Sequence, residues 1–253
     1  MKINSNLSDN QWNTIIRIIG DNRKRKYALR DILDGILYLL KTGCQWRLLP
    51  KCYPAWKLVY YYFTKWKNSG LFIKLHNILR DDLRVKLGKF EGASMGIIDS
   101  QSVKTTRKGG VRGIDGGKKV KGRKRHLIVD SLGLLIAVDV HAANIHDSVG
   151  CMEVIKKATK SSSRLSKIIA DGGYRGKLKN TVKSKYRLKM EIVLRNDSSS
   201  FEVLPKRWIV ERTFAWLESY RRLAKDYEYC VYSSVTMIYL AMTCLMINRL
   251  EKF

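Results

Sequence analysis

The sequence predicts a protein of the α+β or α/β class, with an all-helical domain in residues 1–90 and a mixed five-stranded sheet flanked by helices in residues 91–253. Apolar residues recur at helical spacing through the first domain, and short β-like apolar runs begin near residue 96. Three of these runs follow one another before helices begin to alternate with strands, which favours a mixed sheet. A chain of 253 residues is long enough for two such domains.

Four helices are expected in the first domain. Ser8 and Gln11 form a capping-box pattern that opens the first helix, and Gly20 ends it. The other three are expected over residues 29–43, 56–70 and 71–87. Helices of this length, joined by short turns, could include a helix-turn-helix that places one helix in a major groove of DNA.

The third expected helix carries an aromatic stripe at intervals of three and four residues, made of Trp56, Tyr60, Phe63 and Trp66. We expect this stripe to pack inward as core. The lysines of the same helix would then remain available to contact phosphates; they are Lys57, Lys65 and Lys67.

The strands of the second domain are expected at residues 96–98, 126–129, 134–140, 167–170 and 190–194. Helices are expected over residues 147–157 and 177–185, and a longer one over about 205–224. Residues 104–125 hold ten basic residues and one acid, Asp115, so we expect a mobile loop there that a polyanion orders. Residues 122–125 are interpreted as a phosphate clamp, with a solvated edge as the alternative.

The charge of the chain indicates a polyanionic partner. Lys plus Arg number 49 against 22 Asp plus Glu, a net charge of +27, and the excess is spread over both domains. Such charge favours long-range attraction and counterion release on nucleic acid more than it favours folding. A membrane surface is the alternative, disfavoured because the basic residues do not gather on one amphipathic helix.

The cysteines, the first residues and the longest apolar stretch all predict a soluble cytoplasmic protein. The five cysteines are scattered without a C-x-x-C pair, so we expect reduced thiols. The first twelve residues lack the apolar segment of a secretory signal. The longest apolar stretch, residues 235–247, suits a buried helix better than a membrane span.

Three carboxylates are the candidates for metal-dependent chemistry. Asp99 and Asp171 each follow a short apolar run, so they would face each other if the two strands are neighbours, and Glu211 lies early in an expected helix. Hard oxygen ligands suit Mg²⁺, and two ions about 4 Å apart could drive attack on a phosphodiester. Spacing alone leaves other interpretations open: a turn-capping Asp99, a helix-capping Asp171 and a surface Glu211.

Other polar residues compete for these roles. Asp130 and Asp139 also lie on β-like runs and are the rival metal ligands. His146, Asp147 and Ser148 have the residue types of a hydrolytic triad, but adjacent residues cannot fold back to relay a proton. His146 is therefore expected to cap the following helix or to contact DNA.

Several segments carry a family resemblance. Gly96-Ile97-Ile98-Asp99-Ser100, residues 168–176 and residues 207–222 resemble the surroundings of the three acids in insertion-sequence DDE transposases of the family 4/5-like superfamily. Residues 131–133 and 143–148 resemble the stretch between the first two acids. Residues 7–12 and 43–50 resemble the helical domain that precedes the catalytic domain. The resemblance implies a ribonuclease-H-like fold for the second domain.

The resemblance also implies a function. It implies an enzyme that binds the terminal inverted repeats of an insertion sequence and catalyses Mg²⁺-dependent DNA cleavage and strand transfer, with two ions and with Mn²⁺ able to substitute. Asp99, Asp171 and Glu211 would be the catalytic metal ligands. The expected partners are double-stranded DNA, as transposon ends and target, and further copies of the chain in a homo-oligomer on DNA, with no membrane. The expected location is the bacterial cytoplasm, at the nucleoid when DNA is bound.

Ten basic residues are candidates for DNA binding: Lys104, Arg107, Lys108, Arg123, Lys124, Arg125, Arg207, Arg212, Arg221 and Arg222. The family signature Y-x2-R-x3-E-x6-K has its Arg at Arg207 and its Glu at Glu211, but Leu204 replaces the Tyr and the Lys is absent. Our hypothesis is that an arginine near the end of the signature takes over the DNA-end contact of that Lys; the candidates are Arg212, Arg221 and Arg222.

Three alternative functions stay open. A DNA-binding protein without catalysis, such as an inactive transposase relic, is disfavoured because decay would not spare three carboxylates selectively. A ribonuclease-H-like nuclease would hydrolyse DNA without joining it. A basic RNA-binding protein has little support, because RNA platform motifs are not evident in the sequence.

Overall fold

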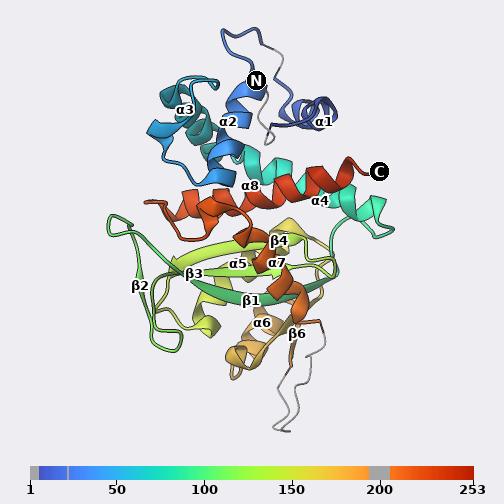
Figure 1. Ribbon diagram of the computed structural model, residues 1–253. Helices are drawn as coiled ribbons and strands as arrows, with labels where there is room; N and C mark the ends of the chain where they lie inside the picture. The colour runs from blue at the N-terminus through green and yellow to red at the C-terminus, as the bar shows by residue number, and fades with distance from the viewer. Residues whose placement is uncertain (1–5, 22, 194–205) are drawn as a thin grey trace.

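The computed structural model describes residues 6–21, 23–193 and 206–253 (Figure 1). The helices are α1 (Asp9–Ile19), α2 (Leu29–Thr42), α3 (Trp56–Asn68), α4 (Leu71–Lys86), α5 (Asp147–Ser161), α6 (Leu178–Tyr186), α7 (Trp208–Glu218) and α8 (Val231–Leu250). Short 3-10 helices are η1 (Trp46–Leu48), η2 (Gly172–Tyr174) and η3 (Arg221–Leu223). The strands are β1 (Met95–Lys104), β2 (Gly113–Asp115), β3 (Val120–Val129), β4 (Leu135–Ala142), β5 (Lys167–Ala170) and β6 (Lys189–Ile192).

Five strands lie side by side in the order β4, β3, β1, β5, β6. Strand β3 is antiparallel to both β1 and β4, whereas β5 is parallel to β1 and β6 is parallel to β5. The predicted class is therefore confirmed: a helical N-terminal region precedes a mixed, ribonuclease-H-like sheet flanked by helices. Strand β2 is a short sixth strand paired with the start of β3.

The expectation of a mobile loop over residues 104–125 is wrong. Strand β1 continues to Lys104, and β2 and β3 form an antiparallel hairpin within the segment. Gly122 allows the main chains to approach closely, because a Cβ atom there would lie only 1.9 Å from the carbonyl oxygen of Val103. Three of the basic side chains in the segment also find buried partners, as described below, so their charges do not keep the segment unfolded.

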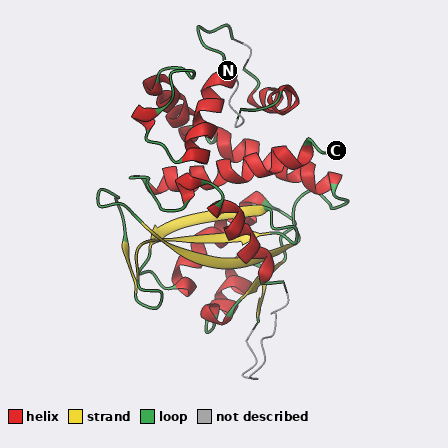
Figure 2. Ribbon diagram, viewed as in Figure 1, coloured by secondary structure: helices red, strands yellow, loops and turns green. Residues whose placement is uncertain are grey.

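Helices cover both faces of the sheet (Figure 2). Each covered face has its own apolar cluster. Ile98 and Ile128 pack with α5 and α6 on one face. Ile97 and Leu127 point to the other face, where they pack with α7 and α8. This alternation follows from the two-residue period of a strand, and it covers the central strand β1 on both faces at residues 96–98.

Helix α8 joins the helical region to the sheet. It packs against both α4 and β4, between the other helices and the sheet (Figure 1). The apolar cluster around it includes Leu39, Leu79, Val138 and Met246, each less than 1% exposed. Among the described residues it is the one helix long and apolar enough to cross a membrane, and 72% of its most apolar window is buried. The prediction of a buried helix there is confirmed, and the core is continuous across the predicted domain boundary near residue 90.

The helical predictions are mostly confirmed. Ser8 and Gln11 form both bonds of the capping box, and Gly20 ends α1 in a left-handed conformation. In the aromatic stripe Phe63 is buried as expected, but Tyr60 is 45% exposed, so the inward-packing prediction is wrong at that position. The long helix expected up to residue 224 instead ends at Glu218, before η3, and its expected start near residue 205 lies outside the described residues.

Candidate active site

The sheet places two of the candidate carboxylates beside each other. Parallel pairing joins Ile97 of β1 to Ile169 of β5. Continuing that register by two residues places Asp99 beside Asp171, which directly follows β5. Glu211 lies in the first turn of α7, which packs against β1. The expectation that the two Asp-bearing strands are neighbours is confirmed.

All three carboxylates surround one cationic nitrogen. Arg207 Nη2 lies 3.6 Å from Asp99 Oδ2, 3.4 Å from Asp171 Oδ2 and 3.6 Å from Glu211 Oε1. Because these distances share one atom, the three oxygens lie within about 7 Å of one another, twice the longest of them. The structure therefore brings the three predicted residues together, and it adds Arg207 at their centre.

The residues present fit a divalent cation. Carboxylate oxygens are the hard ligands that Mg²⁺ and Mn²⁺ prefer, and the Arg207 nitrogen marks where positive charge is stabilised. In the described residues no group of three or more His, Cys, Asp or Glu side chains already stands at ligand distance from a common point. Arg207 occupies the space between the carboxylates, so direct coordination requires its guanidinium to move.

Asp99 is the most buried carboxylate of the three, with a side chain only 16% exposed. Burial raises its pKa to about 6, and nearby Asp171 adds to this increase, although the Ser100 N–H donates to Asp99 Oδ1 at 2.7 Å and opposes it. Asp171 also accepts the Gly173 N–H at 2.9 Å, so the helix-capping interpretation of this residue is correct as well. Asp171 can fill both roles because its Oδ1 caps η2 while its Oδ2 faces Arg207.

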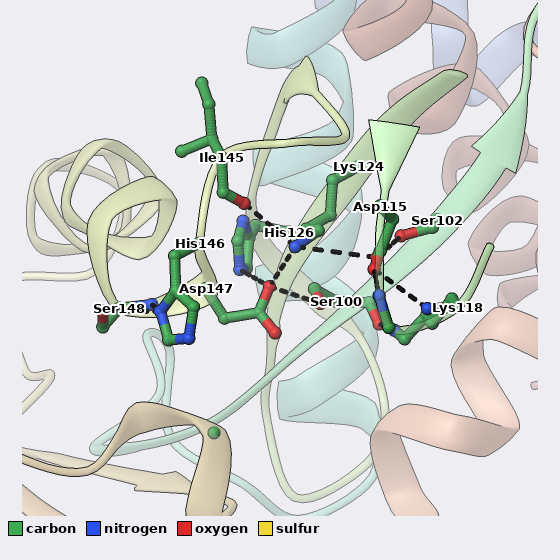
Figure 3. Close-up of polar contacts among 12 residues, drawn as sticks. Ser100, Ser102, Asp115, Lys118, Lys124, His126, Ile145, His146, Asp147 and Ser148 are labelled. Atoms are coloured by element: carbon green, nitrogen blue, oxygen red, sulfur yellow. Dashed lines mark hydrogen bonds and ion pairs between the residues drawn. The ribbon is translucent and has the colours of Figure 1, made fainter. Parts of the chain in front are cut away.

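A fourth carboxylate, Asp147, anchors β1 next to the site (Figure 3). Its Oδ1 accepts from Ser100 Oγ at 2.9 Å and lies 3.0 Å from Lys124 Nζ and 3.4 Å from His126 Nε2. Burial alone would raise the pKa of Asp147, but its contacts with His126, Lys124 and Ser100 lower it well below its usual range. The sequence gives little sign of this cluster, whose members come from three elements.

His146 acts as the cap of α5. Its side chain accepts the Ser148 N–H at 3.3 Å and shares a hydrogen bond with the Ser148 hydroxyl (Figure 3). The helix-capping expectation for His146 is confirmed. Asp147 faces Lys124 and His126 instead of His146. His146, Asp147 and Ser148 therefore do not form a hydrolytic triad.

The rival metal ligands have other partners. Asp130 is fully buried, accepts the N–H groups of Leu132 and Leu134, and forms an ion pair with Arg84 of α4. Asp139 pairs with Lys157 of α5 at 2.6 Å. Asp130 holds the β3–β4 turn against the helical region, and neither residue faces the three candidate carboxylates.

The phosphate-clamp interpretation of residues 122–125 does not fit the structure. Arg123 is fully buried, pairs with Asp226 at 3.1 Å and donates to the carbonyl oxygens of Glu228 and Tyr229. Arg125 is 1% exposed and donates to a main-chain oxygen, and Lys124 is held by Asp147. These side chains are neither a clamp nor a solvated edge, because carboxylates and carbonyls distant in sequence enclose them.

The other DNA-binding candidates differ in accessibility. Lys104, Arg107, Lys108 and Arg221 are exposed. Arg212 is stacked between the rings of Trp208 and Trp216, and Arg222 is 8% exposed in an ion pair with Glu228. The sequence did not single out Lys118, an exposed cation that donates to the Ser100 carbonyl and so lies beside Asp99.

The raised pKa of Asp99 makes a prediction about stability. The folded protein keeps this proton up to about pH 6, whereas the unfolded chain releases it near 3.8, so the folding free energy weakens as pH rises through that window. Asp99→Asn removes the ionisation and should stabilise the protein at pH 7 by about 1 to 3 kcal/mol, with little effect at pH 4.

Urea unfolding in the presence of a chelator, at both pH values, measures this difference. Asp171 and Glu211 remain in the variant to neutralise Arg207. Glu153→Gln, on the exposed surface of α5, is the matched control and should change stability equally little at both pH values. If Asp99→Asn changes the free energy of unfolding equally at pH 4 and pH 7, the Asp99 carboxyl has the same pKa in the folded and unfolded protein and the prediction is wrong.

Comparison with known proteins identifies the family. Residues 91–247 match the family model for the transposase DDE domain, and residues 7–76 match the model for transposases of the IS4/5 family. No curated protein gives a significant match. Among solved structures, one described as "Mos1 transposase paired-end complex with left transposon end" aligns with 92% of this chain and 80% of that chain, at 10% identity and a TM-score of 0.27. Since the DDE-domain match spans more than half of the sequence, the chain belongs to the DDE-domain transposases.

Proposed function

We propose that the protein binds the terminal inverted repeats of an insertion sequence and catalyses Mg²⁺-dependent DNA cleavage and strand transfer. The observation that carries this proposal is the placement of three carboxylate oxygens within 3.6 Å of one guanidinium nitrogen. DDE transposase domains in general use divalent metal ions to transfer phosphoryl groups on DNA. The net charge of +27 supports a polyanionic substrate.

Asp99, Asp171 and Glu211 are the residues that would hold two Mg²⁺ ions, with Mn²⁺ able to substitute. When bound between such carboxylates, two ions make an attacking oxygen anionic and stabilise the leaving oxygen of a phosphodiester. Asp99 and Asp171 are fixed by neighbouring strands. Glu211 is on a helix and has a side chain that is 59% exposed, so it is the carboxylate with most freedom to adjust its position.

Arg207 has two roles in this proposal. Without bound metal ions its guanidinium balances three carboxylates that would otherwise repel one another at close range. With DNA it turns to a phosphate of the scissile strand, where its planar donors match the phosphate oxygens. The side chain is 17% exposed, so part of it is accessible from solvent. The guanidinium would then be replaced by the Mg²⁺ ions, so the carboxylates are balanced by positive charge both before and after Arg207 moves.

Exposed cations around the site would hold the duplex. Lys104 and Lys118 lie on β1 and the β2–β3 hairpin, and Arg221 follows α7. Their distribution over several elements fits a duplex that passes over Asp99, at the point where β5 ends beside β1. Cleavage at the element terminus and attack of the freed 3′ hydroxyl on target DNA would both occur at the same three carboxylates. Two ends must be held together for joining, so we propose a homo-oligomer on DNA.

The proposal predicts that Asp99→Asn, Asp171→Asn and Glu211→Gln each reduce Mg²⁺-dependent nicking of an end-containing duplex by more than about 100-fold. Loss of a partner outside the ligand set typically costs 10- to 100-fold, and loss of a ligand should cost more. DNA affinity should change little, because each substitution removes negative charge. Nicking of a labelled duplex and a gel-shift titration measure the two quantities.

Glu218→Gln is the matched control for this experiment. Glu218 is exposed on the same helix as Glu211 and accepts a hydrogen bond from Gln101, so its variant should retain nicking. A carboxylate variant that nicks at the wild-type rate would refute the assignment of that residue. Strand-transfer products from a pre-cut end would separate a transposase from a nuclease that only hydrolyses.

The structure also separates the arginines proposed to replace the missing Lys of the signature. Arg221 is exposed, whereas the adjacent Arg222 is buried against Glu228. Arg221→Ala should weaken duplex binding and lower the salt dependence of log K by about 0.9, the value for one lost phosphate contact. Arg222→Ala should instead lower the melting temperature, because it leaves Glu228 buried without its partner.

Duplex affinity across a salt series and thermal unfolding measure these two effects. Arg17→Ala, in the distant helix α1, is the control for loss of one positive charge and should leave the salt slope closer to that of the wild type. An unchanged salt slope for Arg221→Ala would remove Arg221 from the DNA contact.

A further inference from the structure

An aromatic groove lies between the helical region and the segment that precedes α8. Its volume is about 620 Å³, and one wall comes from η1 and α3 while the other comes from residues 227–233. Five aromatic side chains line it: Trp46, Trp56, Tyr60, Tyr227 and Tyr229. We call it the Tyr60–Tyr229 groove. None of the three candidate carboxylates lines this groove.

The three tyrosine rings of the groove are exposed. Tyr229 is 76% exposed, Tyr60 is 45% exposed and Tyr227 is 40% exposed. The Tyr60 ring packs edge-on against Trp46 at 5.1 Å, so it is held in place although its outer face meets solvent. Exposed rings that are held rigidly offer flat apolar faces at low entropic cost.

The charge of the groove is positive. Arg47 lies over the Trp56 ring at 5.7 Å, and Lys67 donates to Ser233 Oγ at 3.2 Å. The acid in the lining, Glu228, is already paired with Arg222. Arg47 and Lys67 therefore give the groove a positive charge that matches phosphate.

A buried ionic cluster holds the Tyr229 wall. Arg123 donates to the carbonyl oxygens of Glu228 and Tyr229 at 2.8 Å each and pairs with Asp226. Arg222 donates to the Cys44 carbonyl, which ties the same wall to the helical region. These contacts give both buried arginines a positioning role. Arg123 fixes the Tyr229 wall from outside the groove, whereas Arg222 also lines the groove.

Strand β1 connects the groove to the candidate active site. Just beyond the end of β1, Thr105 forms a bridge with Asp226, whose N–H donates to the Lys104 carbonyl. Thr105 follows Asp99 by six residues, a span of about 20 Å at roughly 3.3 Å per residue in a strand. One DNA strand could therefore reach both places.

We propose that the Tyr60–Tyr229 groove binds unpaired nucleotides of a DNA strand, with bases stacked on its rings and phosphates near Arg47 and Lys67. Stacking faces combined with cations are the general means of holding single-stranded nucleic acid. The faces of bases are hidden in a duplex, so the groove would select a strand that is frayed or already cut. This inference rests on the proposed action on DNA.

Binding of a short oligothymidine, measured by fluorescence anisotropy with the full-length protein, tests the proposal. Tyr60→Ala and Tyr229→Ala should each weaken this binding by about 5- to 100-fold, the range for loss of one stacking partner. Affinity for a blunt duplex should stay within about two-fold of the wild-type value. Tyr61→Ala, an exposed ring on α3 outside the groove, is the matched control and should bind like the wild type.

Circular dichroism and melting temperature confirm that each variant is folded, and Tyr60→Phe, which keeps the stacking face, should restore binding. Unchanged oligothymidine affinity in both alanine variants, or an equal loss of oligothymidine and duplex affinity, would overturn the groove assignment. Failure of the proposed function gives a different result: the wild-type protein itself would neither bind nor nick duplex DNA. If the wild-type protein nicks the duplex and either of the two results above is found, only the groove assignment fails.

Discussion

The candidate active site depends on the attraction between one guanidinium group and three carboxylates. Arg207 lies at the meeting point of β1, the end of β5 and the start of α7, where Asp99, Asp171 and Glu211 converge. Three carboxylates at this separation repel one another unless a cation lies between them. In this structure the negative charge of the carboxylates is balanced by an internal side chain, and any metal ion that binds between them must compete with Arg207.

The rest of the fold keeps this meeting point in place through buried ion pairs. Arg84 and Asp130 join α4 to the β3–β4 turn, and Arg123 and Asp226 join β3 to the segment before α8. Such pairs stabilise the folded state little compared with apolar packing. Breaking one of them leaves an isolated buried charge, however, and this cost favours the single arrangement of elements in which both partners are paired. Part of the large basic excess thus serves the interior, and the remaining exposed cations are those able to meet DNA.

Much of the fold could be predicted from sequence because its signals are local. Apolar runs, the Ser8 capping box and helix-ending glycines depend on neighbouring residues, and the positions of Asp99 and Asp171 after apolar runs are of the same kind. The burial of Arg123 could not be predicted, since its partner Asp226 lies 103 residues away and only the fold brings them together. The position of Arg207 likewise depends on how α7 packs on the sheet.

The most direct test of the central claim is a crystal structure of the DNA-free protein in millimolar Mn²⁺, with anomalous scattering used to locate the metal. The account predicts a Mn²⁺ peak about 2.2 Å from oxygens of both Asp99 and Asp171, with the Arg207 guanidinium moved away from the carboxylates. Carboxylates that remain around Arg207, with no anomalous peak between them, would contradict the claim that these residues form a divalent cation site.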